Sequence, residues 1–391
     1  MHILILASWY PSDLFPHAGI FIRQQAKALK KNGHKIGVVS VIRASREVIK
    51  REKSKSGKLK PEVTDIYTVQ TFVKNYLPFI PYSSGLAWIL AGRSLFRQYV
   101  DQNGMPDILH AHSALYGGAL GVYLKHKYEI PLLITEHSTA LITGKIPIWQ
   151  IYLVKYVFSR SDQGIAVSQG QADTLAIKYD SPKNGWSVVH NLVEELYEEK
   201  KLVKRADDYF RFLSIGYLIP RKDFPSLLKA FSLLQQQAKY EHTLLRIIGE
   251  GDEKKNLLNL AKVLNIETMI EWIPERLPED IIDDYDESHA IVSSSLMETF
   301  GVTLIEGLAR GIPAIATRSG GPQEFIIPKV GKLIDKEQPD KLAEAMAQVI
   351  DAYKTYSPEA IRKYCLDNFG PNAISIQLNE IYSEYANFDE N

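Results

Sequence analysis

Short apolar runs alternate with longer amphipathic stretches along almost the whole chain, and this alternation limits the possible folds more than any other feature. Apolar runs of this length are typical of buried strands, whereas the stretches between them carry apolar residues at helical spacing. Strands and helices in regular succession predict an α/β fold, with a parallel sheet and helices on its faces. In the first half, strands are expected over 3–7, 36–42, 108–111, 131–135, 164–168 and 187–190, and helices over 20–32, 115–128 and 169–179.

The alternation starts again in the second half. A strand is expected over 211–216, a helix over 223–237 and the next strand over 244–249. The head of each half therefore has the same order of strand, loop, helix and strand, without obvious sequence identity between the halves. Two such series predict two Rossmann-like domains facing across a cleft, and Rossmann-like sheets bind ligands at the carboxyl ends of their strands.

The expected domain boundaries follow from composition. A length of 391 residues accommodates two domains at roughly 150 residues each. We expect an N-terminal domain over 1–193 and a second domain over 209–370. The segment 194–208 is dense in charge and has no apolar stripe, so we interpret it as a linker. A C-terminal helix near 371–391 is expected to pack back on the first domain.

Charge is divided unevenly between the halves. The whole chain carries 46 basic and 46 acidic residues, yet residues 1–193 hold a net charge of +11 and the remainder −11. The run 43–60 supplies +6 of this excess and is followed by 76–96, which is rich in aromatic residues and leucine. These two segments predict either a solvated loop or a contact with an anionic membrane surface. Outside the run the first half is only modestly basic, so no nucleic-acid partner is expected.

The chain also lacks several features. Its one cysteine, Cys365, excludes an intrachain disulfide, and no Cys/His cluster has metal-ligand spacing, so no metal is expected. The N-terminal apolar run is too short for a signal peptide and no run of 18 apolar residues exists. We expect a cytoplasmic protein, with a peripheral position on the inner face of the membrane as the alternative.

The most informative stretch runs from Glu298 to Pro313. Strands are expected over 290–293 and 312–317 and a helix over 301–310, so Glu298 lies at the carboxyl end of a strand. The helix N-terminus offers backbone N–H groups to an anion. Glu298 and Glu306 are eight residues apart, and a carboxylate can accept hydrogen bonds from two adjacent hydroxyls of a sugar or ribose. The alternative is that both are surface glutamates of an amphipathic helix.

This stretch resembles the E-x7-E motif of the retaining glycosyltransferases of family 4, which have the GT-B fold, and the resemblance covers nearly the whole chain. It implies that Glu298 and the donor loop that follows, Thr299, Phe300 and Gly301, lie by the donor sugar. It also implies that Glu306 binds the ribose hydroxyls. By the same resemblance, 1–193 is the acceptor-side domain and 209–370 is the nucleotide-sugar donor domain.

Three loops are candidates for binding a diphosphate. Arg221 and Lys222 start a helix, where cations are unfavourable without an anion, and family members carry Arg or Lys in this loop. Gly320 and Gly321 allow close backbone approach to a phosphate and resemble the family's Gly-Gly-x-x-Glu loop, although a plain turn would look the same. Gly19 lies between the first strand and helix, where the family's first loop faces the diphosphate.

Histidines at the ends of two strands complete the candidates. His110 and His112 share one face of their strand, and lone histidines are more often structural. His112 matches a family histidine near the donor sugar, which implies a catalytic role. Glu136 and His137 end the next strand and are acceptor-side candidates.

Two other patterns are rejected. Gly249 and Gly251 suggest a dinucleotide fingerprint, but Lys254 stands where the third glycine belongs, so NAD binding is not expected. Asp284 and Asp286 mimic a metal-binding D-x-D sequence, but they belong to a helical stretch. No cofactor is expected beyond a nucleotide-diphosphate sugar as co-substrate.

These patterns and the resemblance predict transfer of a hexosyl group from a nucleotide-diphosphate sugar to a hydroxyl, with retention and without a metal. The acceptor would be a glycan or lipid-linked molecule of cell-envelope polysaccharide or glycolipid synthesis. No protein nucleophile is clearly placed. We therefore expect the acceptor hydroxyl to attack the sugar from the same face from which the leaving group departs. The alternatives are a nucleotide-sugar 2-epimerase of the same fold and a non-catalytic nucleotide-sugar-binding scaffold.

Overall fold

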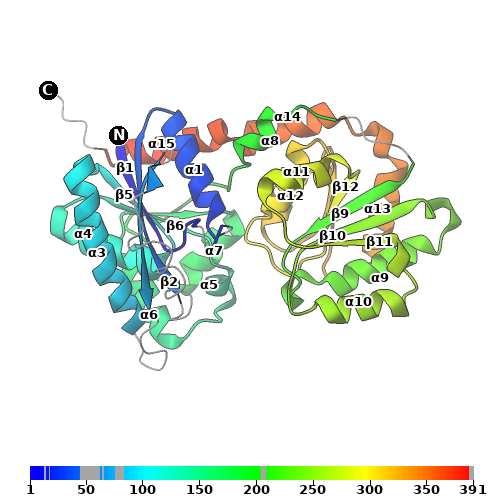
Figure 1. Cartoon of the computed structure of the whole chain (residues 1–391), viewed down its shortest axis with the longest axis horizontal. Coiled ribbons are helices and arrows are strands. Elements are labelled where there is room, and N and C mark those ends of the chain that lie inside the picture. Colours follow the sequence, from blue (N-terminus) through cyan, green and yellow to red (C-terminus); the bar gives the residue numbers. More distant parts are fainter. Residues whose placement is uncertain are drawn as a thin grey trace. The chain divides into compact units, whose positions relative to one another are not determined.

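The computed structural model describes residues 1–12, 15–16, 18–44, 62–63, 66–74, 83–203 and 208–386. Their chain forms two compact units (Figure 1). Unit 1 is Met1–His190 together with the C-terminal stretch from Ile374, and unit 2 is Asn191–Ala373. Each unit is built on its own sheet with helices between successive strands, so the predicted pair of Rossmann-like domains is confirmed.

Unit 1 contains an eight-stranded sheet in the order β3-β4-β2-β1-β5-β6-β7-β8. All neighbouring strands are parallel except β3 and β4. The strands are β1 (His2–Ala7), β2 (Lys35–Ala44), β3 (Glu62–Val63), β4 (Tyr67–Lys74), β5 (Ile108–His112), β6 (Leu132–Glu136), β7 (Gln163–Ala166) and β8 (Trp186–Val188). The helices are α1 (Ile20–Lys31), α3 (Ser83–Asn103), α4 (Ala119–Tyr128), α5 (Thr139–Thr143), α6 (Ile148–Arg160), α7 (Gln169–Lys178) and, continuing from unit 2, α15 (Pro371–Ser383).

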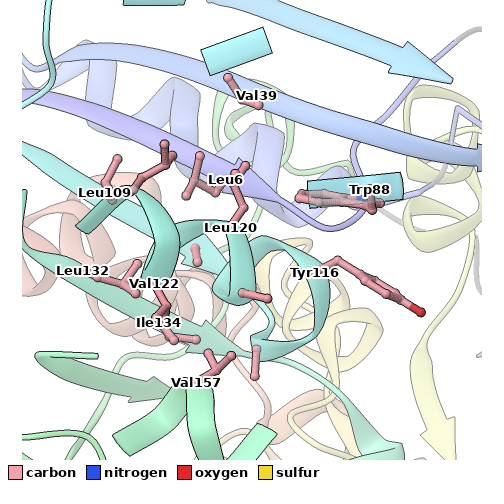
Figure 2. Packing of buried hydrophobic residues seen from close by; sticks show 14 of the residues in the cluster. Leu6, Val39, Trp88, Leu109, Tyr116, Leu120, Val122, Leu132, Ile134 and Val157 are labelled. Atoms are coloured by element: carbon pink, nitrogen blue, oxygen red, sulfur yellow. The ribbon is translucent and has the colours of Figure 1, made fainter. Parts of the chain in front are cut away.

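The core of unit 1 lies between the central strands and the helices α3, α4 and α6 (Figure 2). Every residue of β1 is buried, which is typical of a strand covered on both faces by helices. Leu6 and Leu109 of adjacent strands pack with Leu120 of α4 and Val157 of α6. Trp88 of α3 is fully buried and donates its indole N–H to the carbonyl of Val41 at 2.7 Å.

Unit 2 contains a six-stranded parallel sheet in the order β11-β10-β9-β12-β13-β14. The strands are β9 (Phe210–Ile215), β10 (Thr243–Ile248), β11 (Ile270–Ile273), β12 (Ala290–Ser293), β13 (Ala314–Thr317) and β14 (Gly331–Ile334). The helices are α8 (Glu195–Glu199), α9 (Phe224–Gln235), α10 (Lys254–Val263), α11 (Pro278–Asp286), α12 (Val302–Ala309), α13 (Pro339–Asp351) and α14 (Pro358–Phe369).

Among the parallel strands, the strand order reverses once in each sheet. Ligands of open α/β sheets bind at the carboxyl ends of the strands where this happens. In unit 1 the reversal lies between β1 and β5, and in unit 2 it lies between β9 and β12. At the reversal in unit 1, Gly19 follows β1 and His112 ends β5. Lys222 and Glu298 follow the two strands of the reversal in unit 2.

Two segments differ from the sequence-based expectation. The helix expected over 115–128 begins only at Ala119, because the chain first makes an irregular turn in which Ser113 and Tyr116 have φ of 76° and 67°. This turn passes so close to β1 that a Cβ on Gly117 would lie 2.6 Å from the carbonyl oxygen of Leu6. The segment 194–208, expected as a linker, includes α8, whose Tyr197 is fully buried in unit 2.

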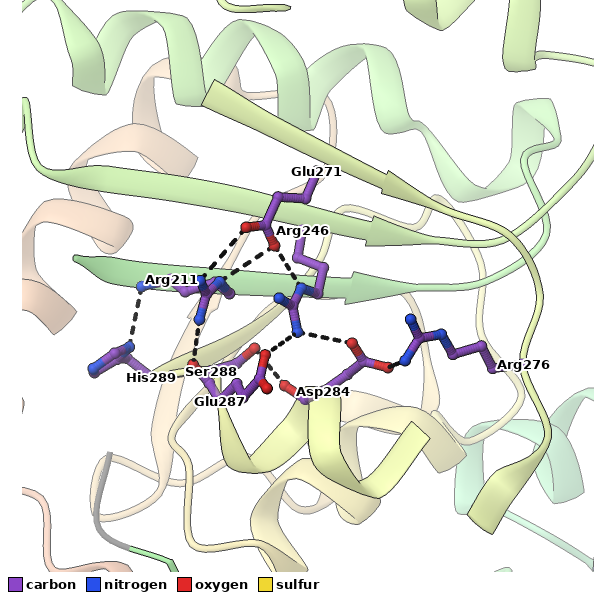
Figure 3. A network of polar contacts seen from close by, with 8 residues as sticks. All are labelled: Arg211, Arg246, Glu271, Arg276, Asp284, Glu287, Ser288 and His289. Atoms are coloured by element: carbon purple, nitrogen blue, oxygen red, sulfur yellow. Dashed lines mark hydrogen bonds and ion pairs between the residues drawn. The ribbon is translucent and has the colours of Figure 1, made fainter. Parts of the chain in front are cut away.

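A network of ion pairs fixes α11 to the sheet of unit 2 (Figure 3). Arg246 of β10 donates to Glu271 at 2.6 Å and to Asp284 and Glu287 at 2.8 Å each. Arg276 donates to the other oxygen of Asp284 at 2.9 Å. The carboxylate of Asp284 is therefore bound on both sides by guanidinium groups, as an interior ion-pair network requires.

Candidate functional site

The loops after β9 and β12 meet through an ion pair. The ammonium of Lys222 lies 2.5 Å from Oε1 of Glu298, and Ser295 donates its hydroxyl to the same oxygen at 2.8 Å. Arg221 lies 4.0 Å from Oε2 of Glu298 and donates to the carbonyl of Met297 at 3.0 Å. The structure thus brings together Lys222 and Glu298, which are 76 positions apart in the sequence.

Hydrogen bonds to backbone carbonyls hold the loops after β9 and β12 together. The N–H of Leu296 donates to the carbonyl of Arg221 at 2.9 Å. The Ser294 hydroxyl lies within hydrogen-bond distance of the carbonyls of Lys222 and Asp223, at 3.1 and 2.9 Å. Arg221 and Lys222 therefore lie on a turn that is hydrogen-bonded to the neighbouring loop, and side chains on a fixed turn lose less entropy in any binding event than side chains on a free loop do.

The glycine pair after β13 lies against the same loop. Glu298 donates its N–H to the carbonyl of Ser319 at 2.9 Å, and Gly321 donates to the carbonyl of Glu298 at 3.1 Å. Gly320 has φ of 120°, and a Cβ on Gly321 would lie 2.2 Å from Cα of Phe300. Only glycine fits such a close approach of two backbones. Arg221, Lys222, Glu298 and the glycine pair therefore form one group at the carboxyl edge of the sheet.

The rest of the expected donor loop leads into α12. Thr299 is half-buried, while Phe300 is buried and packs on the rings of Phe325 and Phe369. Gly301 caps α12 in the left-handed region, with φ of 113°. The buried ring of Phe300 fixes the loop to the core of unit 2. The backbone of Phe300 lies at the edge of the sheet beside Gly321.

Glu306 lies on α12 in a different environment from that of Glu298. The hydroxyl of Tyr285 lies 2.7 Å from Oε2 of Glu306 and 3.1 Å from the carbonyl oxygen of Thr303. The hydroxyl donates to both acceptors, and its contact with the carboxylate of Glu306 is the shorter of the two. Burial raises the pKa of Glu306 to about 7, and the hydrogen bond from Tyr285 opposes this rise.

Sequence analysis missed Tyr285. The residue stands between Asp284 and Asp286, which were interpreted only as a possible metal-binding pair. It belongs to the apolar face of α11. Ile281, Ile282 and Tyr285 are spaced as one face of a helix and are all buried. The helical spacing was the available signal.

A Glu306→Gln variant is expected to change how stability depends on pH. Because folding raises the pKa of Glu306 from 4.5 to about 7, its contribution to stability is fully present below about pH 4.5 and is lost as pH rises through 7. At pH 8 the variant should therefore be more stable than the parent chain by about 1–3 kcal/mol, and most of this difference should be lost near pH 5. Thermal unfolding across pH 5–8 measures this.

The control for this series is Glu267→Gln, which changes an exposed glutamate of unit 2. It should give the same difference from the parent chain at both ends of the pH range. A Glu306→Gln variant that is no more stable at pH 8 than at pH 5, relative to the parent, would contradict a raised pKa.

In unit 1, three histidines gather at the ends of β5 and β6. Nδ1 of His112 lies 3.0 Å from Nε2 of His137, and the two rings are nearly parallel, at 8°. His110 binds the hydroxyls of Thr135 and Tyr382, each at 2.7 Å. Burial lowers the pKa of His110 and His137 to about 3 and that of His112 as well, so all three are neutral.

Glu136 is fully buried, and protein donors occupy both of its carboxylate oxygens. Oε1 accepts from the N–H groups of His137 and Ser138 at 2.9 Å each. Oε2 accepts from the N–H of Ala114 at 2.9 Å and lies 3.4 Å from the Ser113 hydroxyl. The residue expected on the acceptor side therefore ties the loop after β5 to the loop after β6.

Two further residues shape the loops beside β1. The Ser8 hydroxyl lies 2.9 Å from the carbonyl oxygen of His112 and accepts from the N–H of Gly117 at 3.1 Å. Sequence analysis missed Ser8, although it is the first polar residue after a buried strand. Gly19 has φ of 68°, and a Cβ there would lie 2.6 Å from the carbonyl oxygen of Trp9. Both residues allow backbone segments to meet closely at the end of β1.

The segments proposed for membrane contact are only partly described. Of 43–60, the structure describes Arg43 and Ala44 in β2, and the rest lies outside the described residues. Of 76–96, it describes the part in α3, where Trp88 and Phe96 are buried in the core. None of the helices in the described part of the chain is long and apolar enough to cross a membrane.

The two acids of the D-x-D sequence lie on α11, as expected, and pair with different arginines. Asp284 binds Arg246 and Arg276, and Asp286 binds Arg310 at 2.8 Å. Within the ranges described above, no group of three or more His, Cys, Asp or Glu residues is arranged to hold a metal ion.

Two known families match the sequence. The family described as Glycosyltransferase Family 4 matches residues 18–195, and Glycosyl transferases group 1 matches residues 197–364. A D-inositol 3-phosphate glycosyltransferase of Corynebacterium urealyticum is 30% identical over 325 residues, which cover 75% of each chain. The N-acetyl-alpha-D-glucosaminyl L-malate synthase of Bacillus anthracis is 25% identical and covers 100% of this chain and 99% of its own.

Solved structures show a similar fold. Sucrose-phosphate synthase from Thermosynechococcus elongatus superposes with a TM-score of 0.74 at 19% identity and covers 98% of both chains. Anabaena Alr3699/HepE in complex with UDP gives a TM-score of 0.73 at 17% identity, over 98% of this chain and 100% of its own. At these identities the likeness concerns the fold alone.

Proposed function

The chain belongs to glycosyltransferase family 4 and has the GT-B fold, and on this premise we propose that it transfers a hexosyl group from a nucleotide-diphosphate sugar to a hydroxyl. The anomeric configuration is retained and no metal is required. The acceptor is a glycan or lipid-linked molecule, and the reaction serves cell-envelope polysaccharide or glycolipid synthesis.

The observation that carries this proposal is the group formed by Arg221, Lys222 and Glu298 beside the glycine pair at the strand reversal of unit 2. Two cations and one carboxylate leave an excess positive charge at a place where α/β sheets bind ligands. A departing nucleoside diphosphate gains negative charge as its bond to the sugar breaks. Fixed cations stabilise that charge without reorganising.

The proposed reaction balances without an added reactant. The bond between the anomeric carbon and the diphosphate oxygen breaks, and its electron pair stays on the diphosphate. The acceptor hydroxyl attacks the same face of the anomeric carbon, and its proton passes to the departing phosphate oxygen. Attack from that face gives retention, and the cationic pair at Arg221 and Lys222 takes the role that a metal would otherwise have.

The donor class is supported by the neighbours and by Glu306. Structures of Anabaena Alr3699/HepE were solved with UDP and with UDP-glucose. One oxygen of Glu306 is held by Tyr285, and the ionised carboxylate accepts from two vicinal hydroxyls such as those of ribose. The named relatives act on inositol 3-phosphate and on malate, both hydroxyl compounds, which supports a hydroxyl acceptor.

A panel of donors tests the proposal. UDP-glucose, UDP-galactose, UDP-N-acetylglucosamine, GDP-mannose and ADP-glucose are screened by thermal shift, since a ligand at about 100 times its Kd stabilises by about 2.7 kcal/mol. The best donor is then incubated with and without hydroxyl acceptors, and the products are analysed. Transfer, or slow donor hydrolysis without an acceptor, is expected. A 2-epimerised sugar without any acceptor would favour the epimerase, and binding without any turnover would favour the scaffold.

We also propose that unit 1 contacts an anionic membrane. Leu86 and Leu90 of α3 are exposed. On α6, Ile148, Tyr152 and Tyr156 form a four-residue-spaced stripe with exposed fractions of 70%, 66% and 49%. Amphipathic helices with aromatic stripes and flanking basic residues bind the interface of a bilayer. The net positive charge of the first half supports an anionic surface.

Tyr152→Glu is expected to weaken binding to anionic vesicles at low salt by about tenfold, because it places a charge in the apolar stripe. Co-sedimentation with phosphatidylglycerol vesicles measures this. Val263→Glu on α10 of unit 2 is the matched control, since Val263 is also well exposed but lies outside unit 1, and this variant should bind as the parent does. A parent chain that ignores these vesicles at low salt would overturn the proposal.

A further inference from the structure

The hydroxyl of Tyr197 is buried in unit 2 and has no hydrogen-bond partner among the residues that the structure describes. Tyr197 lies on α8, and its side chain is fully buried. Leaving a buried hydroxyl unpaired is unfavourable, and phenylalanine would fill nearly the same space without that cost. A role for the oxygen atom is therefore favoured over packing of the ring alone.

Tyr197 is linked to Glu306 through the ring of Tyr285. The rings of Tyr197 and Tyr285 pack edge to face with centroids 5.7 Å apart, and the hydroxyl of Tyr285 donates to Oε2 of Glu306 at 2.7 Å. Burial, and after it the negative charge of Glu306, raise the pKa of Tyr197 well above its ordinary value. Tyr197 therefore keeps its hydroxyl hydrogen at neutral pH, and the charge of Glu306 attracts that hydrogen.

The backbone of α8 is fixed to unit 2 at this point. The guanidinium of Arg310 is fully buried and donates to the carbonyls of Tyr197 and Lys200 at 3.3 and 2.7 Å. Arg362 of α14 donates to the carbonyl of Glu198. The ring of Tyr197 is thus held in place, while its hydroxyl hydrogen can turn about the bond between carbon and oxygen.

The titratable and charged groups around Tyr197 and Glu306 come from α8, α11, α12 and α14. They are Glu194, which precedes α8, Tyr285 and Asp286 of α11, Arg310 of α12, and Arg362 and Cys365 of α14. Asp286 and Arg310 form an ion pair with each other. Burial raises the pKa of Cys365, so this residue stays a neutral thiol. Tyr285 already donates to Glu306, which leaves the hydroxyl of Tyr197 as a second donor of the same kind.

We propose that Tyr197 is a positioning residue of the ribose site, where its hydroxyl turns toward Glu306 and holds the carboxylate ionised for two vicinal hydroxyls. A nucleotide that covers this carboxylate excludes the water that would stabilise its charge, so hydroxyl groups of the protein take over that role. Tyr285 supplies the first of these groups and Tyr197 supplies the second. This inference rests on the proposed function for its nucleotide, whereas the coupling of Tyr197 to Glu306 is a property of the chain alone.

Thermal unfolding tests this coupling without any ligand. Tyr197→Phe removes the hydroxyl and keeps the ring, and it is combined with Glu306→Gln. At pH 8 we expect Glu306→Gln to raise the midpoint temperature by about 2–4 °C more beside Tyr197→Phe than in the parent, because the ionised carboxylate has lost a stabilising hydroxyl. At pH 5 Glu306 is largely neutral, and the two changes in midpoint should agree. Equal changes at pH 8 would overturn the proposal.

Calorimetry with two nucleotides tests the role in binding. UDP, or the nucleoside diphosphate of the best donor in the panel, is compared with its 2′,3′-dideoxy form. The ratio of the two affinities reports recognition of the vicinal hydroxyls and cancels the titration of the phosphates. In the parent chain we expect this ratio to rise as pH increases through about 7, because Glu306 ionises there.

Tyr197→Phe should move this rise to higher pH by about one unit. Such a shift lowers the affinity for the natural nucleotide by about fivefold at pH 7 and hardly at all at pH 9. The affinity for the dideoxy form should stay unchanged. An equal loss for both nucleotides, or no loss for either at pH 7, would overturn the positioning role, since a defect in the fold alone does not distinguish the two ligands.

Two variants and the parent complete the design. Tyr209→Phe removes an exposed hydroxyl from the same unit and should behave as the parent does. Tyr285→Phe removes the observed hydrogen bond to Glu306 and should move the rise at least as far as Tyr197→Phe does. A parent chain that binds both nucleotides equally at every pH would overturn the proposal. If the parent binds no nucleoside diphosphate of the panel, the proposed function fails, while the unfolding series still decides on the coupling.

Discussion

Lys222→Ala is expected to lower kcat by about 10–100-fold while the chain stays folded. The ammonium of Lys222 is 2.5 Å from Glu298 and lies at the carboxyl edge of the sheet, with a side chain that is 16% exposed. Its charge is therefore largely shielded from water, and it acts on a diphosphate more strongly than a surface lysine would. Steady-state kinetics with the best donor of the panel measures the loss, and circular dichroism checks the fold.

Two further variants define what the loss means. Lys229→Ala removes an exposed lysine from α9 of the same unit and should leave kcat unchanged. Lys222→Ala combined with Glu298→Gln removes the carboxylate that the first change leaves unpaired. If the loss came only from that unpaired carboxylate, the double variant would recover activity. Near-normal turnover in Lys222→Ala alone would rule out the proposal that Lys222 stabilises the departing diphosphate.

Arg310→Met is expected to lower the free energy of unfolding of unit 2 by about 3–5 kcal/mol. The side chain of Arg310 is fully buried. It binds both oxygens of Asp286, at 2.8 and 2.9 Å, and it donates to the carbonyls of Tyr197, Lys200 and Lys201. Its removal leaves the largely buried carboxylate of Asp286 and the carbonyl groups of Tyr197, Lys200 and Lys201 without this donor. Scanning calorimetry measures the effect, because it can resolve separate transitions of the two units.

The controls for Arg310 use an exposed pair and a repaired pair. Arg318→Met breaks an ion pair with Asp335 whose side chains are 53% and 68% exposed, so it should cost less than about 1 kcal/mol. Combining Arg310→Met with Asp286→Leu removes the unpaired carboxylate and should recover part of the loss. An Arg310→Met variant as stable as Arg318→Met would contradict the expectation that the buried contacts of Arg310 stabilise unit 2.

Most strands could be read from the sequence. The run expected over 3–7 is β1, and that over 290–293 is β12, because an apolar run between turn residues has few other interpretations. The gathering of Lys222, Glu298 and Gly320 also follows from sequence. Each stands just after a strand, and the carboxyl ends of parallel strands share one edge of a sheet.

The partners of these residues could not be read in the same way. Tyr285 and Ser8 act through contacts with distant segments, and nothing local in the sequence encodes such a contact. Glu136 was an acceptor-side candidate because it ends a strand. Its burial depends on four donors from two loops, which only the folded arrangement brings together. The delayed start of α4 likewise follows from the close approach of the chain to β1.

The helix α15 has a consequence for the order in which the protein is completed during synthesis. Tyr382 of α15 is buried against unit 1 and binds His110, and Tyr385 binds Asn184 and Gln163. Unit 2 is continuous in the chain from Asn191 to Ala373, whereas unit 1 needs residues from both ends. Domains generally fold as units while the chain emerges from the ribosome. Here unit 1, most of which is translated before unit 2, cannot be completed until the codons that follow unit 2 have been translated, and β5 with His110 lacks its contact with Tyr382 until then.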